Sequence, residues 1–316
     1  MTNAQPKRVV SLIASATEIV CALGARDLLV GRSHECDFPP DVTRLPSLTE
    51  PKFPVTGTSY EIDARVKAIL QEGLSVYRVD AERLEALKPD VIVTQDHCEV
   101  CAVSLKDVEA ALCARVGWRV EIVSLRPDSL ADIWEDIAKV ARALDRERQG
   151  EHLVIQLKER MASIAEQCGA ARKCPRVAMI EWIDPLMAGG NWMPELVQRA
   201  GGENLFAVAG QPSPWLDWDQ IVVADPDVVL VHPCGFDITR TLQEMPLLEH
   251  CPGWHDLKAV QRDHIFVADG NQYFNRPGPR VVESLEILAE IFHPEVFPSC
   301  HEGRGWVRYG SESRLV

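Results

Sequence analysis

The sequence lacks the features that would assign it at once to several large classes of protein. No apolar run in its 316 residues is long enough to cross a bilayer. A glycine-rich phosphate loop and the G-x-S-x-G turn of serine hydrolases are both missing. Aromatic residues make up only 6%, and 33 Lys and Arg are outnumbered by 47 Asp and Glu. The net charge of −14 excludes an extended nucleic-acid interface and a polybasic membrane anchor, because both need a basic face.

An export signal is also not apparent. Lys7 and Arg8 precede an apolar stretch, but Glu18 interrupts that stretch. The segment fits a strand over residues 8–13 and a helix over 15–23 better than a signal peptide. We therefore expect a cytoplasmic protein, whose ten cysteines are free thiols or metal ligands rather than disulfides.

Residues 145–171 predict one long helix. Apolar residues recur in it at steps of three and four, from Leu153 to Cys168, so they share one helix face. Asp145 is the expected N-cap and Gly169 the expected stop. A helix of about 25 residues spans roughly 38 Å at 1.5 Å per residue. This length suits a connection between two bodies.

Strand and helix patterns alternate on both sides of this helix. They predict an α/β protein with two Rossmann-like lobes, each on a parallel sheet, joined by the single backbone helix, with a ligand cleft between the lobes. The expected parts are an N-terminal lobe (1–127), connecting helices (128–172), a C-terminal lobe (173–292) and an irregular tail (293–316). Within the first lobe, residues 39–60 are rich in Pro, Thr and Ser and predict a loop.

One segment of the first lobe resembles a segment of the second. Residues 87–98 read LKPDVIVTQDHC and residues 224–234 read ADPDVVLVHPC. Both predict a helix end, a buried parallel strand, and a His and a Cys beyond the carboxyl end of the strand. Ligands of open α/β sheets bind beyond the carboxyl ends of the strands, so we expect both loops to face the ligand.

Five motifs resemble, in order, those of the BtuF-type cobalamin-binding proteins. They are VSLIASATEIVCALG at 10–24, VGRSHECDFPP at 30–40, LEALKPD at 84–90, AGGENLF at 200–206 and YFNRPGPR at 273–280. These proteins belong to the periplasmic-binding-protein class in which one helix connects two α/β lobes. The resemblance covers nearly the whole chain to about residue 292. It implies a binding protein rather than an enzyme, with cobalamin or a related corrinoid as ligand and, for an exported member, an ABC permease as partner.

The resemblance also implies roles for individual residues. Trp215 falls where the family places a tryptophan against the corrin, and Tyr273 and Phe274 match an aromatic pair there. Glu82 matches the glutamate that docks the first lobe onto the transporter. Asp219 is an approximate match for the docking acid of the second lobe.

Other candidates come from the residues themselves. Glu181 and Trp182 follow a predicted strand, and a rigid aromatic wall suits a flat macrocycle. His34, His97 and His232 also follow strands. A neutral imidazole near the ligand is a candidate axial ligand for cobalt.

Four cysteines depart from the family pattern. Cys98 and Cys101 form a C-x2-C pair after one strand, and Cys36 and Cys234 follow two others. Four converging thiolates would hold an iron–sulfur cluster or a zinc ion. The alternative is that these cysteines are small buried hydrophobic residues.

Three functions stay open on the sequence. The first is a cytoplasmic corrinoid-binding protein. The second is an iron–sulfur or other metal-cluster protein, with a redox enzyme as one form, because a fold does not fix a function. The third is a transporter-docked substrate-binding protein whose export signal has been removed.

Overall fold

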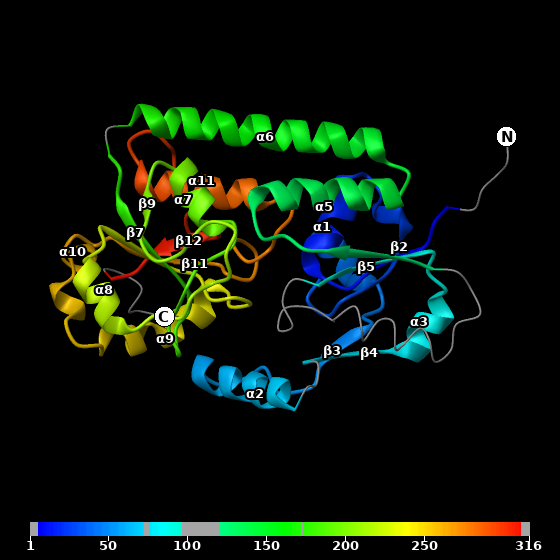
Figure 1. Cartoon of the computed structure of the whole chain (residues 1–316), viewed down its shortest axis with the longest axis horizontal. Helices are drawn as coiled ribbons and strands as arrows, with labels where there is room; N and C mark the ends of the chain where they lie inside the picture. Colours follow the sequence, from blue (N-terminus) through cyan, green and yellow to red (C-terminus); the bar gives the residue numbers. More distant parts are fainter. Residues whose placement is uncertain (1–5, 73–75, 97–119, 172, 311–316) are drawn as a thin grey trace. The chain divides into compact units, whose positions relative to one another are not determined.

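The computed structural model describes residues 6–72, 76–96, 120–171 and 173–310 (Figure 1). The chain divides into two compact units, and each is an α/β structure built around its own sheet. Unit 1 comprises residues 1–57, 64–127 and 131–156, and unit 2 comprises residues 58–63, 128–130 and 157–316. The prediction of an α/β protein is confirmed.

The main sheet of unit 1 is parallel, and its described strands follow the order β2-β1-β5-β6. The strands are β1 (Val9–Ser11), β2 (Leu29–Arg32), β5 (Val91–Gln95) and β6 (Glu121–Leu125). Every residue of the two central strands, β1 and β5, is buried. Continuous apolar runs are typical of parallel strands covered on both faces, which is why the sequence pattern located both strands.

The structure describes further, short elements in residues 14–143. They are the helices α1 (Ala14–Ala22), α2 (Ser59–Gln71), α3 (Ala81–Leu87) and α5 (Leu130–Ala143), the 3-10 turns Arg26–Leu28 and Pro40–Arg44, and the antiparallel pair β3 (Thr49–Pro51) and β4 (Tyr77–Val79). The prediction of a loop over residues 39–60 is therefore wrong in part. A three-residue strand and a single 3-10 turn are too short to show a hydrophobic period.

Unit 2 contains a mixed sheet whose described strands follow the order β12-β11-β10-β7-β8, with β9 beside β7. Its strands are β7 (Arg176–Trp182), β8 (Met187–Ala188), β9 (Glu203–Asn204), β10 (Val228–Val231), β11 (Ile265–Ala268) and β12 (Trp306–Arg308). The strands β7, β9, β10 and β11 are parallel, whereas β8 and β12 run antiparallel to their neighbours. The carboxyl ends of β7, β10 and β11 therefore lie at one edge of the sheet.

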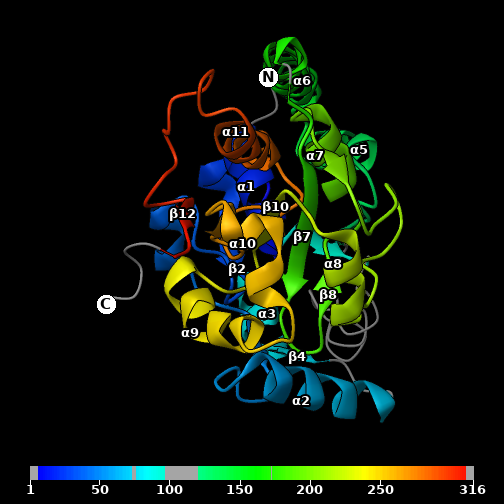
Figure 2. The same ribbon diagram turned by 90° about the vertical axis from the view of Figure 1, so that its left-hand side faces the viewer.

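Helices flank this sheet, and Figure 2 shows α8 and α9 to either side of β7. The helices of unit 2 are α7 (Met193–Arg199), α8 (Trp218–Ala224), α9 (Ile238–Glu249), α10 (Lys258–Gln261) and α11 (Val281–Phe292), with a 3-10 turn at Trp254–Asp256. The core between them includes Val229, Val231, Met245 and Trp254. Burial of such side chains contributes about 25 cal/mol for each Å² of apolar surface removed from water.

The long predicted helix is present as α6 (Glu147–Ala170). Its residues up to 156 belong to unit 1 and those from 157 onward to unit 2, so one continuous helix connects the units (Figure 1). The predicted apolar face is confirmed, because Leu157, Met161, Ile164 and Cys168 are buried. Asp145 is not the N-cap that the sequence indicated. It has a left-handed φ of 56° and its N–H donates to the carbonyl of Arg142, so it belongs to the turn that ends α5.

The segment after α11 is part of unit 2. Buried Glu290, on α11, accepts hydrogen bonds from the backbone N–H groups of Cys300 and His301. It also accepts from Nδ1 of His301 and Nε1 of Trp306, both at 2.8 Å. Strand β12 then pairs with β11. One buried carboxylate thus fixes a segment for which the sequence indicated no regular structure. Among the described residues, no helix is long and apolar enough to span a membrane.

Candidate functional site

The loop that follows β2 holds His34 in a fixed orientation. Oγ1 of Thr49 lies 2.8 Å from Nδ1 of His34 and accepts the backbone N–H of His34 at 3.0 Å. Thr49 donates in turn to Oγ of Ser33 at 3.0 Å. Burial, and to a smaller extent the Arg32 guanidinium, lower the pKa of His34. Since both effects disfavour the charged ring, the imidazole is neutral at neutral pH.

Tyr77 and Glu35 lie beside this histidine. The Tyr77 ring packs against the His34 ring with centroids 5.2 Å apart, and its hydroxyl donates to Oε1 of Glu35 at 3.0 Å. Nε2 of His34 is 3.9 Å from the same carboxylate oxygen, which is beyond hydrogen-bond distance. An imidazole, a phenol and a carboxylate thus lie together at the carboxyl end of β2, where ligands of α/β sheets bind.

Cys36 follows in the same loop, but its side chain points into the interior of unit 1. It is 1% exposed, and its Sγ lies 3.0 Å from Oγ1 of Thr17 on α1. Thr17 also contacts Oγ of Ser11 at 2.8 Å. This is the environment of a packed thiol, the alternative considered from the sequence.

The other predicted metal ligands are dispersed or lie elsewhere. Cys98, Cys101 and His97 fall outside the described residues, so their roles stay predictions. Cys234 is half-buried in unit 2, whereas Cys36 belongs to unit 1. Among the residues that the structure describes, no three His, Cys, Asp or Glu side chains are grouped closely enough to hold a metal ion. The predicted iron–sulfur or zinc site has no support from this part of the chain.

In unit 2, β7 brings Glu181 and Trp182 to the carboxyl edge of the sheet. Oε2 of Glu181 accepts a hydrogen bond from the Ser213 hydroxyl at 2.9 Å. The indole N–H of Trp182 donates to the carbonyl of Asp184 at 3.1 Å, and its ring packs against that of Phe236 with centroids 5.2 Å apart. Both side chains are half-buried and held by local contacts.

Trp215 lies on a neighbouring loop and is 54% exposed. The loop is fixed at its base by an antiparallel bridge between Trp215 and Met187 and by a 2.8 Å hydrogen bond from the N–H of Leu216 to the carbonyl of Leu186. A large flat side chain is therefore presented at the surface from an ordered backbone. Such an indole is suited to stacking on a planar ligand.

Tyr273 and Phe274, which the family resemblance places against the ligand, are buried, with exposures of 4% and 1%. The Arg280 guanidinium lies 4.7 Å from the centre of the Tyr273 ring. Phe274 has a left-handed φ of 60°, a conformation that costs a non-glycine residue about 1–3 kcal/mol. Hydrogen bonds from its N–H to Ser284 and from the Trp192 indole to its carbonyl hold it there. Direct contact of this pair with a ligand stays a prediction.

His232 follows β10 and is fully enclosed. Its ring stacks on Phe274 with centroids 4.9 Å apart, and neither ring nitrogen has a hydrogen-bond partner among the described residues. Burial lowers its pKa to about 3. Gly189 packs against the ring, since a Cβ at that position would lie 3.4 Å from two of the ring atoms. His232 is thus a neutral core residue in this structure, closed to a ligand.

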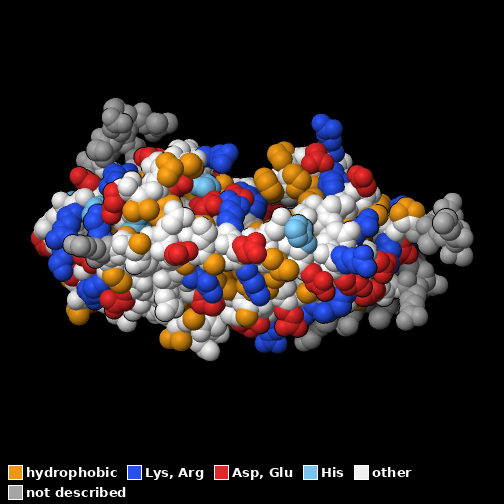
Figure 3. Space-filling view, turned by 90° about the horizontal axis from the view of Figure 1, so that it is seen from above, with side chains coloured by type: hydrophobic (Ala, Val, Ile, Leu, Met, Phe, Trp, Pro, Cys, Tyr) orange, Lys and Arg blue, Asp and Glu red, His pale blue; other side chains and the backbone are white. Residues whose placement is uncertain are grey.

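The two predicted docking residues are exposed. Glu82 lies in the first turn of α3 in unit 1, and Asp219 lies in the first turn of α8 in unit 2. On the molecular face in Figure 3, acidic and basic side chains are interspersed. Each carboxylate is accessible on its own unit, and the docking role of both residues stays a prediction.

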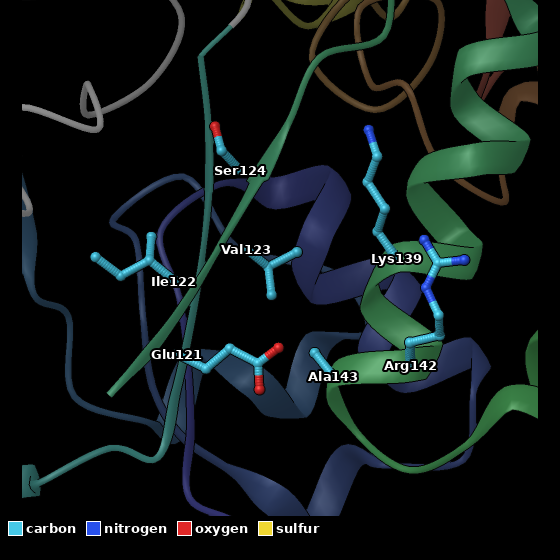
Figure 4. Close-up of a pocket in the computed structure, with 7 residues that line it drawn as sticks. All are labelled: Glu121, Ile122, Val123, Ser124, Lys139, Arg142 and Ala143. Atoms are coloured by element: carbon cyan, nitrogen blue, oxygen red, sulfur yellow. The ribbon is translucent and has the colours of Figure 1, made fainter. Parts of the chain in front are cut away.

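A small open cavity of about 290 Å³ lies within unit 1, between β6 and α5 (Figure 4). Its lining residues are Glu121, Ile122, Val123, Ser124, Lys139, Arg142 and Ala143. Small-molecule sites occupy about 300–1,000 Å³, so this cavity is too small to enclose a corrin macrocycle. It is also lined along β6 rather than at the carboxyl ends of the central strands.

Sequence reasoning did not identify several partners of the candidate residues. Thr49 lies 15 positions after His34 in a segment predicted as loop, and Ser213 is 32 positions from Glu181. Phe236 carried no signal of its contact with Trp182. A single sequence does not show which residues pair across such separations.

Comparisons with known proteins give the chain its family. The family described as "Periplasmic binding protein" matches residues 9–271. YvrC of Bacillus subtilis, an uncharacterized ABC transporter substrate-binding lipoprotein, is 23% identical over 301 residues, covering 93% of this chain and 82% of its own. The vitamin B12-binding protein of Vibrio parahaemolyticus is 23% identical over 296 residues, covering 92% and 91%.

Solved structures show the same fold. The apo periplasmic haem-binding protein RhuT of Roseiflexus aligns with a TM-score of 0.67 at 24% identity, over 92% of this chain and 99% of its own. The periplasmic vitamin B12-binding protein BtuF of Vibrio cholerae aligns with a TM-score of 0.64 at 21% identity, over 91% and 97%. The predicted architecture of two α/β lobes linked by a long helix is confirmed. With the family pattern spanning most of its length, the chain belongs to the periplasmic binding protein family and has the substrate-binding role of that family.

Proposed function

We propose that this protein binds a corrinoid, cobalamin or a close relative, through the loops at the carboxyl ends of its strands. The observation that carries the proposal is the exposed indole of Trp215 on a loop whose base is fixed. A rigid aromatic face loses little conformational entropy when it stacks on a flat ligand. Relatives named as vitamin B12-binding proteins support the ligand class.

The polar groups of unit 2 suit the rim of such a ligand. Corrinoids carry amide side chains around the ring, and amides donate to carboxylates and hydroxyls. Glu181 and Ser213 are hydrogen-bonded to each other near the half-buried Trp182. An apolar wall with a few oriented polar groups is typical of small-molecule sites.

We extend the proposal to location, and place the protein in the cytoplasm. The N-terminal segment that resembles a signal peptide is part of the fold of unit 1, because β1 is a central strand and Ala16, Ile19 and Val20 of α1 are fully buried. The alternative is an exported protein that works with an ABC permease. In that case Glu82 and Asp219 would serve as docking residues. Cell fractionation with an antibody against the native protein distinguishes the two cases.

Calorimetric titration of the purified protein with cyanocobalamin tests the ligand. We expect one ligand per chain and retention of the visible corrin spectrum after desalting. Hemin, titrated in parallel, tests whether a porphyrin is preferred, since RhuT is named as haem-binding. No heat and no retained colour with cyanocobalamin would reject the proposal. Tighter binding of hemin than of any corrinoid would replace it by haem binding.

A further inference from the structure

The surroundings of His34 favour a proton on Nδ1 of its ring. A threonine hydroxyl has one proton, and that of Thr49 is donated to Oγ of Ser33 at 3.0 Å. The same oxygen accepts the backbone N–H of His34, so the ring Nδ1, 2.8 Å away, is a second donor to it. With Thr49 donating to Ser33, the neutral ring carries its proton on Nδ1 and has a lone pair on Nε2.

Nε2 of His34 is not used by the fold. Within the described part of the chain it has no hydrogen-bond partner, and its nearest charged neighbour is Oε1 of Glu35 at 3.9 Å. That oxygen accepts the Tyr77 hydroxyl instead. The His34 side chain is 27% exposed, so a ligand can approach the lone pair.

Other described histidines lack this combination. Nε2 of His293 donates to the carbonyl of Ala200, and both nitrogens of His301 face carboxylates, at 2.8 Å for Glu290 and 3.7 Å for Glu286. His232 is enclosed. His34 alone among these four presents an oriented, neutral imidazole from the carboxyl end of a strand.

We propose that Nε2 of His34 coordinates the cobalt of the bound corrinoid at an axial position, and that Thr49 and Ser33 orient the ring for this bond. The inference rests on the proposed function and adds the residue that binds the metal of the ligand. A neutral imidazole suits cobalt and iron, and metal-bound histidines commonly donate their other ring N–H to an oxygen acceptor. The cobalt–nitrogen bond replaces one cobalt–water bond, the water leaves, and neither an electron nor a proton is transferred.

The test uses aquacobinamide, a corrinoid without its own nucleotide base and with an exchangeable water on cobalt. Binding to the full chain should shift the visible absorption bands of the corrinoid. After reduction to Co(II), the electron paramagnetic resonance spectrum should show coupling to one nitrogen. Because the probe supplies no axial nitrogen, this coupling must come from the protein. Labelling the histidines with ¹⁵N should change the splitting from a triplet to a doublet.

Three variants assign the signal to one residue. His34→Gln should remove the band shift and the nitrogen coupling and weaken aquacobinamide binding at least ~10-fold, given that loss of even an orienting partner costs about 10–100-fold at metal sites. Thr49→Val should keep the coupling with weaker binding, and Thr49→Ser should restore the affinity. The control His152→Gln changes an exposed histidine of α6 and should leave everything unchanged.

Dicyanocobinamide separates this inference from the proposed function. Cyanide occupies both axial positions of this probe and blocks coordination by His34. The affinity for dicyanocobinamide should therefore be equal in the wild type and His34→Gln. Two outcomes would overturn the assignment and leave corrinoid binding intact. In one, the wild type binds aquacobinamide without a band shift or nitrogen coupling. In the other, His34→Gln keeps both the shift and the coupling. If neither probe binds the wild type, the proposed function fails, and the assignment fails with it.

Discussion

The backbone N–H of Arg176 donates to Oδ2 of Asp227 at 3.1 Å. In unit 1, the N–H of Arg8 donates to Oδ2 of Asp90 at 2.8 Å in the same structural position. In both units the aspartate precedes a buried strand, and the arginine stands at the start of the strand beside it. The side chain of each arginine also donates to the carbonyl that ends the preceding helix, at Leu87 or Ala224. The similarity between residues 87–98 and 224–234 therefore reflects a repeated hydrogen-bond arrangement.

Removing either aspartate should destabilise its own unit. Asp90→Ala and Asp227→Ala each remove the acceptor for a strand N–H, with an expected cost of about 1–2 kcal/mol in the free energy of unfolding. Denaturant titrations measure the change. Asp90→Asn and Asp227→Asn keep an acceptor oxygen and should lose less. Equal losses for the Ala and Asn variants would contradict the role assigned to the hydrogen bond.

Trp215 should contribute to ligand affinity without contributing much to stability. Trp215→Ala is expected to weaken cyanocobalamin binding about 10-fold or more, which corresponds to about 1.4 kcal/mol or more. Trp215→Phe, which keeps a ring, should lose less. The control Val223→Ala changes another exposed apolar residue of unit 2, on α8, and should bind normally. Normal calorimetric affinity of Trp215→Ala would remove this residue from the site.

His232 should make the folded protein sensitive to acid. Its pKa is about 3 in the fold against an ordinary value of 6.5. Above pH 6.5 the His232 ring is neutral in both the folded and the unfolded state. Between pH 6.5 and 3 only the ring of the unfolded state takes up a proton. Stability therefore falls with pH across that window, by about 2–3 kcal/mol at pH 4.5.

His232→Leu removes this titration while keeping a buried side chain of similar size. The difference in unfolding free energy between pH 7 and pH 4.5 should shrink by that amount relative to the wild type. His255→Gln, at an exposed histidine, should leave the difference unchanged. An unaltered pH dependence in His232→Leu would show that other groups govern acid unfolding.

Glu290 should hold the segment after α11 in place. Glu290→Gln loses acceptor capacity for four donors and leaves some of them unsatisfied, with an expected cost of about 1–3 kcal/mol. Residues 294–305 should then become more susceptible to limited proteolysis. The comparison is Glu203→Gln, which removes an exposed ion pair with Arg176 away from this segment and should cost less than about 1 kcal/mol. Equal protease resistance in both variants would argue against the anchor.

Two glycines should respond in opposite directions to alanine. A Cβ on Gly270 would lie 2.1 Å from the carbonyl oxygen of Pro233, and backbone cannot move aside easily. Gly270→Ala should therefore destabilise the protein by about 1–3 kcal/mol or more. A Cβ on Gly169, in α6, would have no atom within 4 Å. Gly169→Ala should be neutral or stabilising by up to ~1 kcal/mol, and thermal melts compare the two.

The sequence was sufficient to locate the helices and strands whose hydrophobic pattern is long and regular. The helix α6 and the strand β1 lie within two residues of their predicted bounds, and β5 and β10 lie in the two similar segments, because long apolar faces and fully buried strands leave clear patterns. Helices α2 and α9 gave no clear prediction. Their apolar positions are few, and Pro246 lies inside α9, where a proline normally argues against a helix.

The candidate site was less predictable than the fold. The sequence indicated which side chains lie near the carboxyl ends of strands. His34 and Trp215 do lie on loops at or near the surface, and the half-buried Glu181 and Trp182 end strand β7. It did not indicate depth, so the burial of Tyr273, which was expected against the ligand, was not predicted. In the sequence, Tyr273 cannot be told apart from an exposed aromatic residue of a loop, because its burial depends on contacts with distant segments.

Strand β12 has a consequence for how this protein behaves in concentrated solution. It occupies the outer side of β11 through antiparallel pairing at Phe266, Val267 and Ala268. A shortened chain without β12 would present that row of amide and carbonyl groups to other molecules, and such open margins invite intermolecular strand addition and fibre growth. This edge strand thus protects solubility, and purification tags that disturb residues 306–308 would promote self-association.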